Sequence, residues 1–202
     1  MARRKKEDAL ETREKILDAA ESCFCMMGVS GTSLQEIATK AGCSRGAISW
    51  HFKEPIEILR AVLERGRLPL LDDLAFAATL EHQVLPAFRA SLRKSFWLIK
   101  NDKHVRAALE ILVFRCDFSG GGKEFLEAHR RELMMMRSLF CDVLERASFS
   151  KEIKLKCPSS IIASHITSAL LGAIKAHFLD LGEVDLETNA VGAIEAILIA
   201  EC

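Results

Sequence analysis

Apolar residues recur at three- and four-residue steps along most of the chain, which is the spacing of one face of an α-helix. The first run of this kind consists of Leu10, Ile16, Leu17, Ala20, Phe24 and Met27. Gly28 and Gly31 follow it, and glycine commonly ends a helix because it tolerates the left-handed backbone conformation found there. The pattern therefore predicts a first helix that ends near residue 27.

Two short helices are predicted next, each after a residue that suits a helix start. Ser33 and Glu36 have the spacing of a capping box, in which the hydroxyl and the carboxylate each bind a helix-end amide. Gly42 then ends this helix. Ser44 can cap the next one, which we expect over residues 45–52.

The rest of the chain predicts longer helices, over residues 55–78, 82–100, 103–118, 123–148, 158–180 and 186–200. Pro55 suits the first turn of the first of these, and Gly66 and Pro69 predict a kink within it. Segments rich in Gly, Ser or Pro separate several helices, at 119–122, 148–158 and 182–183. No strand-like alternation appears, so we expect an all-α protein of about nine helices. We divide it into an N-terminal domain, residues 1–54, and a C-terminal domain, residues 55–202.

Composition and charge narrow the class of protein. Half of the 202 residues are hydrophobic, which suffices for a buried core and excludes an intrinsically disordered chain. The most apolar stretch, residues 161–181, contains two histidines, Lys175 and Asp180, so it does not predict a membrane span. The basic residues 3–6 are followed by acidic residues and not by an apolar run, unlike a signal peptide. We therefore expect a cytoplasmic protein without a membrane segment.

Cysteines, histidines and short motifs do not indicate an enzyme. Seven cysteines in a chain without a secretory signal indicate reduced thiols. Cys23 and Cys25 are two residues apart on a predicted helix and point to different faces, which disfavours a shared metal ion. The six histidines show no spacing typical of a metal site, so we expect no metal and no cofactor. The chain has no H-E-x-x-H motif, no phosphate-binding glycine loop and no G-x-S-x-G motif.

The two short helices within residues 33–52 have the layout of a helix-turn-helix, whose second helix enters the DNA major groove. The second helix begins with Ser44, Arg45 and Gly46. Arginine can bind guanine O6 and N7 with two hydrogen bonds, and glycine lets the backbone come close to DNA. Short helix pairs also occur as plain packing units, so this arrangement by itself is compatible with DNA binding and with a purely structural role.

Polar residues at the helix ends add candidate phosphate contacts. Thr32 and Ser33 begin the first short helix and can offer hydroxyls and amides to a phosphate. His51 and Lys53 lie at the end of the second, where the phosphate backbone would pass. These four residues therefore join the candidate interface.

Residues 12–20, 28–29, 32–38, 41–48 and 50–53 read TREKILDAA, GV, TSLQEIA, AGCSRGAI and WHFK. In this order, and without insertions or deletions, they closely resemble the DNA-binding domain of TetR-family repressors. Residues 110–118, with the sequence EILVFRCDF, are similar to a segment in the multidrug-efflux-pump repressors of the AcrR and TtgR type. The chain thus resembles that subgroup of the family.

The resemblance implies a homodimer whose first three helices bind a palindromic double-stranded DNA operator and whose last two helices pair between subunits. The helices between them would enclose a cavity for a small lipophilic inducer. By shifting the fourth helix, the inducer would change the spacing of the two recognition helices and release the operator. The implied function is repression of a multidrug efflux-pump operon, although an activator role also occurs in the family.

The residue chemistry and the resemblance together give four sets of candidate residues. Candidate DNA contacts are Thr32, Ser33, Ser44, Arg45, Gly46, Ser49, Trp50, His51 and Lys53. Candidate effector-cavity residues, most of which we expect to pack in the core, are Phe88, Leu92, Phe96, Trp97, Leu109, Val113, Met134, Met135, Ile166, Leu170, Ile174 and Phe178. Candidate polar anchors for an effector are His165, Thr167, Ser168, Lys175 and His177. Candidate dimer residues are Ala163, Ala169, Gly172, Ala173, Ala176, Gly192, Ala193, Ile194, Ala196, Ile197 and Leu198.

Two positions depart from the family pattern. The family usually has Tyr where this chain has Ser49, and Lys where it has Pro55, and both family residues help to hold DNA. Losing a lysine–phosphate contact weakens binding to every sequence. The basic stretch Arg3–Lys6 could compensate by following the DNA, as basic arms do elsewhere.

A thiol-based redox sensor is the alternative from another class. It would use the same DNA-binding half and switch on oxidation of Cys43, in the turn between the two short helices, or of another cysteine. Reactive thiols need a partly exposed and electropositive site, and Arg45 is close in sequence. The family commonly has a small apolar residue at this position, so the resemblance favours a packing role for Cys43.

Overall fold

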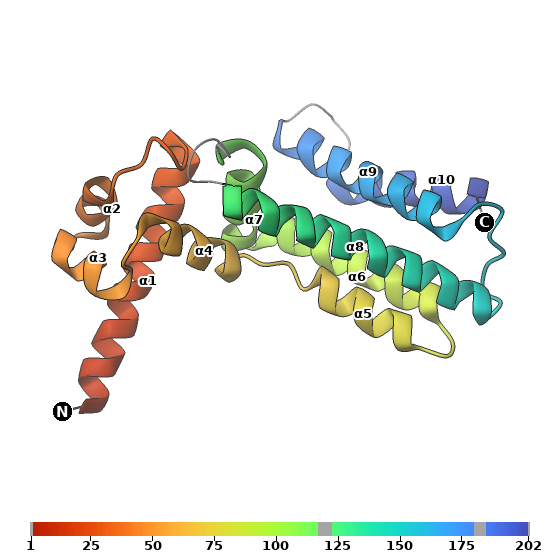
Figure 1. Ribbon diagram of the computed structural model, residues 1–202, viewed down its shortest axis with the longest axis horizontal. Helices are drawn as coiled ribbons and strands as arrows, with labels where there is room; N and C mark the ends of the chain where they lie inside the picture. The colour runs from red at the N-terminus through yellow and green to blue at the C-terminus, as the bar shows by residue number, and fades with distance from the viewer. Residues whose placement is uncertain (1, 117–122, 180–184, 202) are drawn as a thin grey trace. The chain divides into compact units, whose positions relative to one another are not determined.

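The computed structural model describes the backbone of residues 2–116, 123–179 and 185–201, and the side chains from residue 7 and from residue 126 in the first two ranges (Figure 1). The described segments are helical or irregular, without a strand, which confirms the all-α prediction. The α-helices are α1 Ala2–Met27, α2 Leu34–Ala41, α3 Arg45–His51, α4 Pro55–Arg65, α5 Leu70–Thr79, α6 Val84–Asn101, α7 Lys103–Glu110, α8 Lys123–Phe149, α9 Ser159–Phe178 and α10 Leu186–Glu201, and the segment η1 Ile111–Arg115 is a π-helix.

The chain forms two compact units. The first consists of Met1–Arg67 and Asn101–Ser119, and the second consists of Leu68–Lys100 and Gly120–Cys202. Helix α7 and η1 therefore belong with α1–α4, although α5 and α6 precede them in sequence. A functional division at residue 54 stays a prediction.

The predicted capping chemistry of α2 is present. The Ser33 hydroxyl accepts a hydrogen bond from the Glu36 amide at 3.2 Å, and the Glu36 carboxylate accepts one from the Ser33 amide at 2.7 Å. Gly42 ends the helix with a left-handed backbone, φ 65°. Both ends of α2 are thus set by the residues from which they were predicted.

Local chemistry also sets the ends of α1 and α3. Helix α1 stops at Met27, and Gly28 adopts φ 78° while its amide donates to the Phe24 carbonyl. Ser44 caps α3 by accepting a hydrogen bond from the Ala47 amide at 3.1 Å. The predictions for these helix ends are confirmed within one residue.

The prediction of one kinked helix over residues 55–78 is wrong, because the structure breaks it into α4 and α5. A Cβ atom on Gly66 would lie 2.3 Å from the His104 carbonyl oxygen, so the end of α4 packs directly on the backbone of α7. Pro69 then provides no amide for a continuing helix. The described residues consequently contain ten α-helices and not nine.

The predicted helix over residues 103–118 is also divided. Its first part is α7, and the next five residues form the π-helical segment η1, which ends at Arg115. The Arg115 carbonyl accepts a hydrogen bond from the Val29 amide at 3.0 Å, just beyond α1. The predicted linkers 119–122 and 182–183 and the side chains of Arg3–Lys6 lie outside the described residues.

In the first unit, α1 is the central helix and contacts α2, α3, α4, α7 and η1. Its predicted apolar face is buried at Ile16, Leu17, Ala20 and Phe24, whereas Leu10 and Met27 at its two ends are exposed. Burial of such side chains is the main favourable term in folding. Helices α2 and α3 lie beside α1 (Figure 1), and each brings a fully buried isoleucine to this core.

In the second unit, α8 packs against α5 and α9, and α9 packs against α10. Helix α6 buries its apolar face, and the Phe88 ring meets the Phe140 ring of α8 edge-on at 5.9 Å. The Glu152 carboxylate, beyond α8, accepts hydrogen bonds from the Val84 and Leu85 amides at 2.9 Å and so caps α6. The start of α6 is thus held by a residue distant in sequence.

Among the described helices, α9 is long and apolar enough to pass a simple test for a membrane span. It nevertheless packs between α8 and α10, and a third of its most apolar window is buried inside the protein. Core helices of soluble proteins pass the same test, and we assign α9 to the packed unit.

Candidate nucleic-acid interface and effector residues

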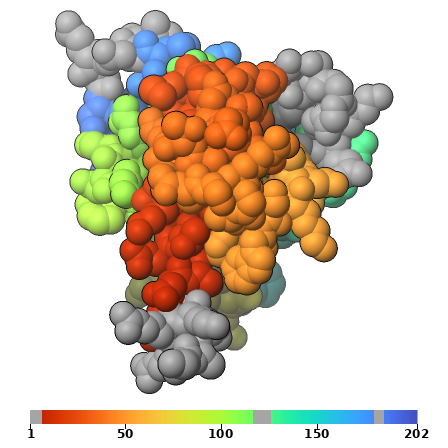
Figure 2. Space-filling view, turned by 90° about the vertical axis from the view of Figure 1, so that its left-hand side faces the viewer, coloured from red at the N-terminus to blue at the C-terminus, as the bar shows by residue number. Residues whose placement is uncertain are grey.

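Helix α3 buries one side and exposes the other. Ile48 is fully buried and holds the helix on the unit, whereas Arg45, Gly46 and Ser49 are exposed and Trp50 is 73% exposed. Figure 2 shows this side of the unit, where residues of α2 and α3 form a continuous surface beside α1. The structure therefore brings the predicted residues of α3 together on one open face.

The hydroxyls at the start of α2 are engaged within the protein. Thr32 donates to the Gly28 carbonyl at 2.7 Å, and Ser33 is committed to the capping box with Glu36. The hydrogen bonds from the Ser33 amide and hydroxyl lower the pKa of the Glu36 carboxyl. Thr32 and Ser33 thus lie where they were predicted, beside a carboxylate that stays ionised.

The exposed face of α3 offers backbone access and one flexible cation. A Cβ atom on Gly46 would meet only the Ser44 hydroxyl, at 3.7 Å, so the surface there is open. The Ser49 hydroxyl donates to the Arg45 carbonyl at 3.2 Å and is turned back onto its own helix. The exposed Arg45 guanidinium can reach a base edge from this helix start.

His51 and Lys53 follow this face in different ways. The His51 ring packs edge-on against Trp50 at 4.6 Å. Burial and then the charge of Arg13 lower the pKa of His51, so its imidazole is neutral near pH 7. The Lys53 amide donates to the Glu57 carboxylate at 2.7 Å, and its side chain is exposed. Pro55 begins α4 next to it, where the family pattern has a cation.

Half of the twelve predicted effector residues are buried in a core. Phe88, Leu92, Phe96, Ile166, Leu170 and Ile174 are buried, and Phe178 is half-buried, all in the second unit. Trp97, Met134 and Met135 are more than half exposed. Leu109 and Val113 belong to the first unit. The buried members of the set thus lie on α6 and α9, and contact of any member with an effector stays a prediction.

Several predicted polar anchors already have partners. The His165 imidazole lies 2.6 Å from the Glu201 carboxylate, and the Thr167 hydroxyl donates to the Ala163 carbonyl at 2.7 Å. Thr167 therefore serves its own helix, and His165 joins α9 to α10.

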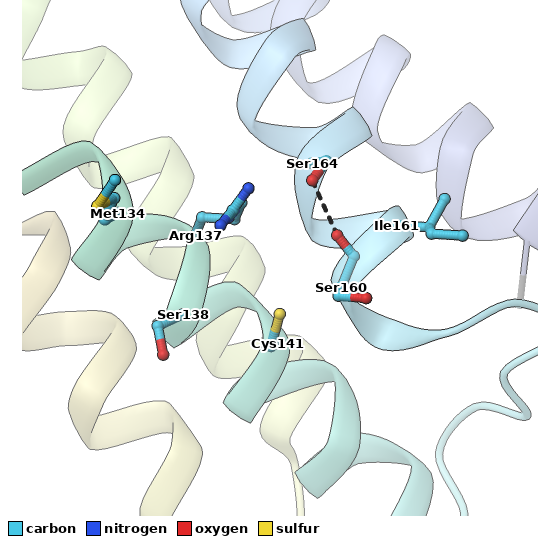
Figure 3. A pocket seen from close by; sticks show the side chains of 7 residues that line it. All are labelled: Met134, Arg137, Ser138, Cys141, Ser160, Ile161 and Ser164. Carbon is cyan, nitrogen blue, oxygen red and sulfur yellow. Dashed lines mark hydrogen bonds between the residues drawn. The ribbon is translucent and has the colours of Figure 1, made fainter. Parts of the chain in front are cut away.

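A pocket of about 480 Å³ lies on the surface between α8 and α9 (Figure 3). It is lined by Met134, Arg137, Ser138, Cys141, Ser160, Ile161 and Ser164. Among these residues, sequence reasoning named only Met134 as an effector contact, because it selected apolar positions, and four of the lining residues are arginine or serine. The α8 side of this pocket could have been predicted from spacing, because Met134, Arg137, Ser138 and Cys141 lie on one face of a helix.

Burial disfavours four of the cysteines as the reactive thiol of the alternative sensor. Burial raises the pKa of Cys25 and of Cys116 to about 11, and it also raises the pKa of Cys23 and Cys141. A raised pKa keeps a thiol protonated and slow to react. Cys43 is a half-buried free thiol, and its oxidation stays a prediction.

One group of side chains in the first unit has the composition of a metal site. Oxygen and nitrogen atoms of Asp18, Glu21 and His104 lie within 4.8 Å of one another. The Arg65 guanidinium lies among them, 2.9 Å from Asp18 and 2.5 Å from Glu21. The guanidinium therefore occupies the position that a metal ion would take and supplies the positive charge there.

Comparison with known proteins gives one consistent result. Residues 16–62 match the family model described as "Bacterial regulatory proteins, tetR family". The chain is 31% identical to the transcriptional repressor BepR of Brucella suis over 171 residues, which cover 84% of this chain and 81% of BepR. It is 40% identical to the regulator TtgR of Pseudomonas putida over 121 residues, which cover 59% of this chain and 57% of TtgR.

A solved structure agrees over nearly the whole chain. SmeT is the repressor of the Stenotrophomonas maltophilia multidrug efflux pump SmeDEF, and its complex with triclosan matches this fold with a TM-score of 0.82. The two chains are 30% identical, and the match covers 94% of this chain and 91% of SmeT. These relatives are transcriptional regulators and not enzymes. The chain belongs to the TetR family and is a transcriptional repressor related to those of multidrug efflux pumps.

Proposed function

We propose that this protein acts in the cytoplasm as a homodimer that binds a palindromic operator, and that a small lipophilic effector releases it. The regulated operon encodes a multidrug efflux pump. The observation that carries the proposal is the face of α3, where Arg45, Gly46 and Trp50 are exposed around the buried anchor Ile48. The relation to SmeT supports the kind of operon and the kind of effector.

In this proposal each exposed residue of α3 has a defined task. Arg45 reads a base edge in the major groove, and Gly46 lets the backbone approach the duplex. Trp50, His51 and Lys53 lie against the phosphate backbone. Thr32 and Ser33 keep α2 in place through their hydrogen bonds and orient its first amides toward a phosphate.

The dimer forms through α9 and α10. Ala163, Ala173, Ile194 and Leu198 are buried within the unit, so the interface uses the other side of these helices. Leu171 and Ile199 are exposed there, 39% and 76%, and a Cβ atom on Gly172 or Gly192 would have no neighbour within 4 Å. Exposed apolar side chains beside small residues suit a close helix–helix contact.

The dimer contact is tested with Ile199→Asp. We expect analytical ultracentrifugation to show a shift toward monomer, because a carboxylate is placed in an apolar interface. Phe149→Asp is the matched control, since Phe149 is 78% exposed and lies on α8. An unchanged dimer in Ile199→Asp, or an equal shift in both variants, contradicts this interface.

Operator binding is tested by fluorescence anisotropy with the protein's own upstream duplex and with a scrambled duplex over a salt series. We expect tight binding to the native duplex alone at physiological salt. Arg45→Ala should weaken that binding by about 1–3 kcal/mol. Arg131→Ala, on α8, is the matched control. Equal and strongly salt-dependent binding to both duplexes would overturn sequence-specific recognition.

Release is tested with triclosan as the probe, because a structure of the related repressor SmeT holds it. Triclosan should lower the affinity of the wild-type protein for the native duplex and raise its thermal unfolding midpoint. A raised midpoint without a change in operator affinity would contradict coupling between the two sites.

A further inference from the structure

Three helices of the first unit meet at one buried carboxylate, Glu21 of α1, which is 7% exposed. Arg65, the last residue of α4, donates from Nε to Glu21 Oε1 at 3.0 Å. His104, the second residue of α7, places Nδ1 2.9 Å from Glu21 Oε2. A single side chain therefore joins α1, α4 and α7.

Arg65 extends this contact along α1. Its Nη1 atom lies 2.9 Å from Asp18 and 3.1 Å from Glu14. The Arg65 side chain is 16% exposed, whereas both of these carboxylates are about half exposed. Burial alone would lower the pKa of Arg65, but the hydrogen bond and charge of Glu21, with those of Glu14 and Asp18, raise it. The guanidinium is thus held as a cation across two turns of α1.

Two further features fix α7 at this junction. The Asp102 carboxylate caps α7 by accepting hydrogen bonds from the His104 and Val105 amides at 2.8 and 3.2 Å. Gly66, next to Arg65, packs so closely that an added Cβ atom would lie 2.3 Å from the His104 carbonyl oxygen. The backbones of α4 and α7 therefore have little freedom to slide past each other.

We propose that Glu21 is a positioning residue for operator binding, because it fixes the direction of α1 relative to α4 and α7. Helix α1 contacts both α2 and α3, so its direction sets the direction of the recognition helix within the unit. This inference rests on the proposed operator-binding dimer. A palindromic operator accepts two recognition helices only at a fixed separation. Loss of the Glu21 contacts then weakens simultaneous binding to two half-sites, while the exposed face of α3 in each subunit stays unchanged.

This prediction separates positioning from ordinary stabilisation. A buried ion pair that served stability alone would, when broken, lower the folded fraction and weaken binding to every duplex equally. A positioning residue changes the ratio of the affinities for a full operator and for a single half-site. The ratio is therefore the decisive measurement.

The experiment compares Glu21→Gln, His104→Ala and the double variant in the full-length protein. We expect Glu21→Gln to weaken binding to the full operator about tenfold or more and to change half-site binding by less than about twofold. His104→Ala should have a smaller effect of the same kind. The double variant should match Glu21→Gln, because His104 acts through Glu21. Glu11→Gln is the matched control, since this exposed carboxylate of α1 pairs only with Lys15 among the described residues.

The possible results distinguish failure of this inference from failure of the proposed function. Equal losses on the full operator and on the half-site, or additive effects of the two substitutions, would overturn the inference. If Glu21→Gln fails to fold by circular dichroism, His104→Ala carries the same test, because His104 lies at the edge of the cluster. A wild-type protein that binds no duplex specifically overturns the proposed function, and this inference with it. A wild-type protein that binds while the ratio stays constant overturns the inference alone.

Discussion

The two units use charge differently to hold their helices together. In the first unit, Arg65 and His104 converge on one buried carboxylate, Glu21. In the second unit, the ion pairs are more exposed: Arg89 binds Glu195, Lys94 binds Asp73 and Lys100 binds Asp185, and their side chains are between 29% and 53% exposed. A shared buried acceptor makes its partners interdependent, whereas more exposed pairs contribute less to stability.

The difference indicates where each unit tolerates change. Substituting one partner in the second unit leaves the remaining pairs in place, and salt screens what is lost. Substituting Glu21 or Arg65 disturbs three helices at once. The following predictions break or sharpen this contrast, beginning with the largest expected effect.

Removing the central cation should have the largest effect on stability. In Arg65→Ala, three carboxylates of α1 lose their common partner, and Glu21 is left buried with His104 alone. We expect a loss of about 3–5 kcal/mol in the free energy of unfolding by urea denaturation. Lys94→Ala, which removes an exposed cation from α6, should cost less than about 1 kcal/mol. Similar losses in the two variants would remove the contrast between the units.

The steric contact at Gly66 gives an independent probe of the same junction. Gly66→Ala places a methyl group against the His104 carbonyl, so we expect a loss of about 1–3 kcal/mol in the free energy of unfolding. Gly46→Ala is the control, because the surface at Gly46 is open, and it should not lower the free energy of unfolding. If Gly66→Ala is as stable as Gly46→Ala, the backbones of α4 and α7 can separate without penalty.

A substitution on the exposed face of α3 should change operator affinity without altering the contacts of Glu21 with Arg65 and His104. Ser49 binds the carbonyl of its own helix, and the resemblance implies that a tyrosine there would reach the DNA. Ser49→Tyr should therefore tighten operator binding about three- to tenfold, or roughly 1 kcal/mol, as measured by anisotropy. Ser138→Tyr, at an exposed position of α8, should not change it. Weaker binding by Ser49→Tyr would mean that this surface fits a different operator contact.

The smallest expected effect is on the pH dependence of the free energy of unfolding, to which one histidine of each unit contributes. Burial lowers the pKa of His51 in the first unit and of His129 in the second. The unfolded chain therefore takes up these protons at a higher pH than the folded protein does. Stability should fall as the pH decreases from the ordinary histidine pKa, near 6.5, toward the lowered folded values. Urea denaturation between pH 7.5 and 5.5 should show a shallower fall in His51→Gln and in His129→Gln.

Helix ends followed from the sequence wherever their cause is local. The bonds between Ser33 and Glu36, the left-handed Gly42 and the cap at Ser44 all involve residues within a few positions of each other. The recognition helix was placed correctly for the same reason. Its exposed face follows from one buried residue, Ile48, in a short helix.

The break after α4 and the role of Glu21 were not predictable in this way. Gly66 is required by the backbone of His104, nearly forty positions later. Glu21 looks like an ordinary carboxylate on a helix face, because its partners lie 44 and 83 positions away. The pocket beside Arg137 likewise arises only when α8 and α9 come together. Long-range contacts of this kind leave no periodic signal in the sequence.

The division of the chain into units has a consequence for its synthesis. The polypeptide leaves the first unit at Arg67 and returns to it at Asn101, so the ribosome makes α5 and α6 before the first unit has all its parts. A nascent chain that ends at Arg67 already contains α1–α4. Glu21 in such a chain has Arg65 within reach but lacks His104. The DNA-reading unit therefore reaches its final form only after more than half of the protein has emerged.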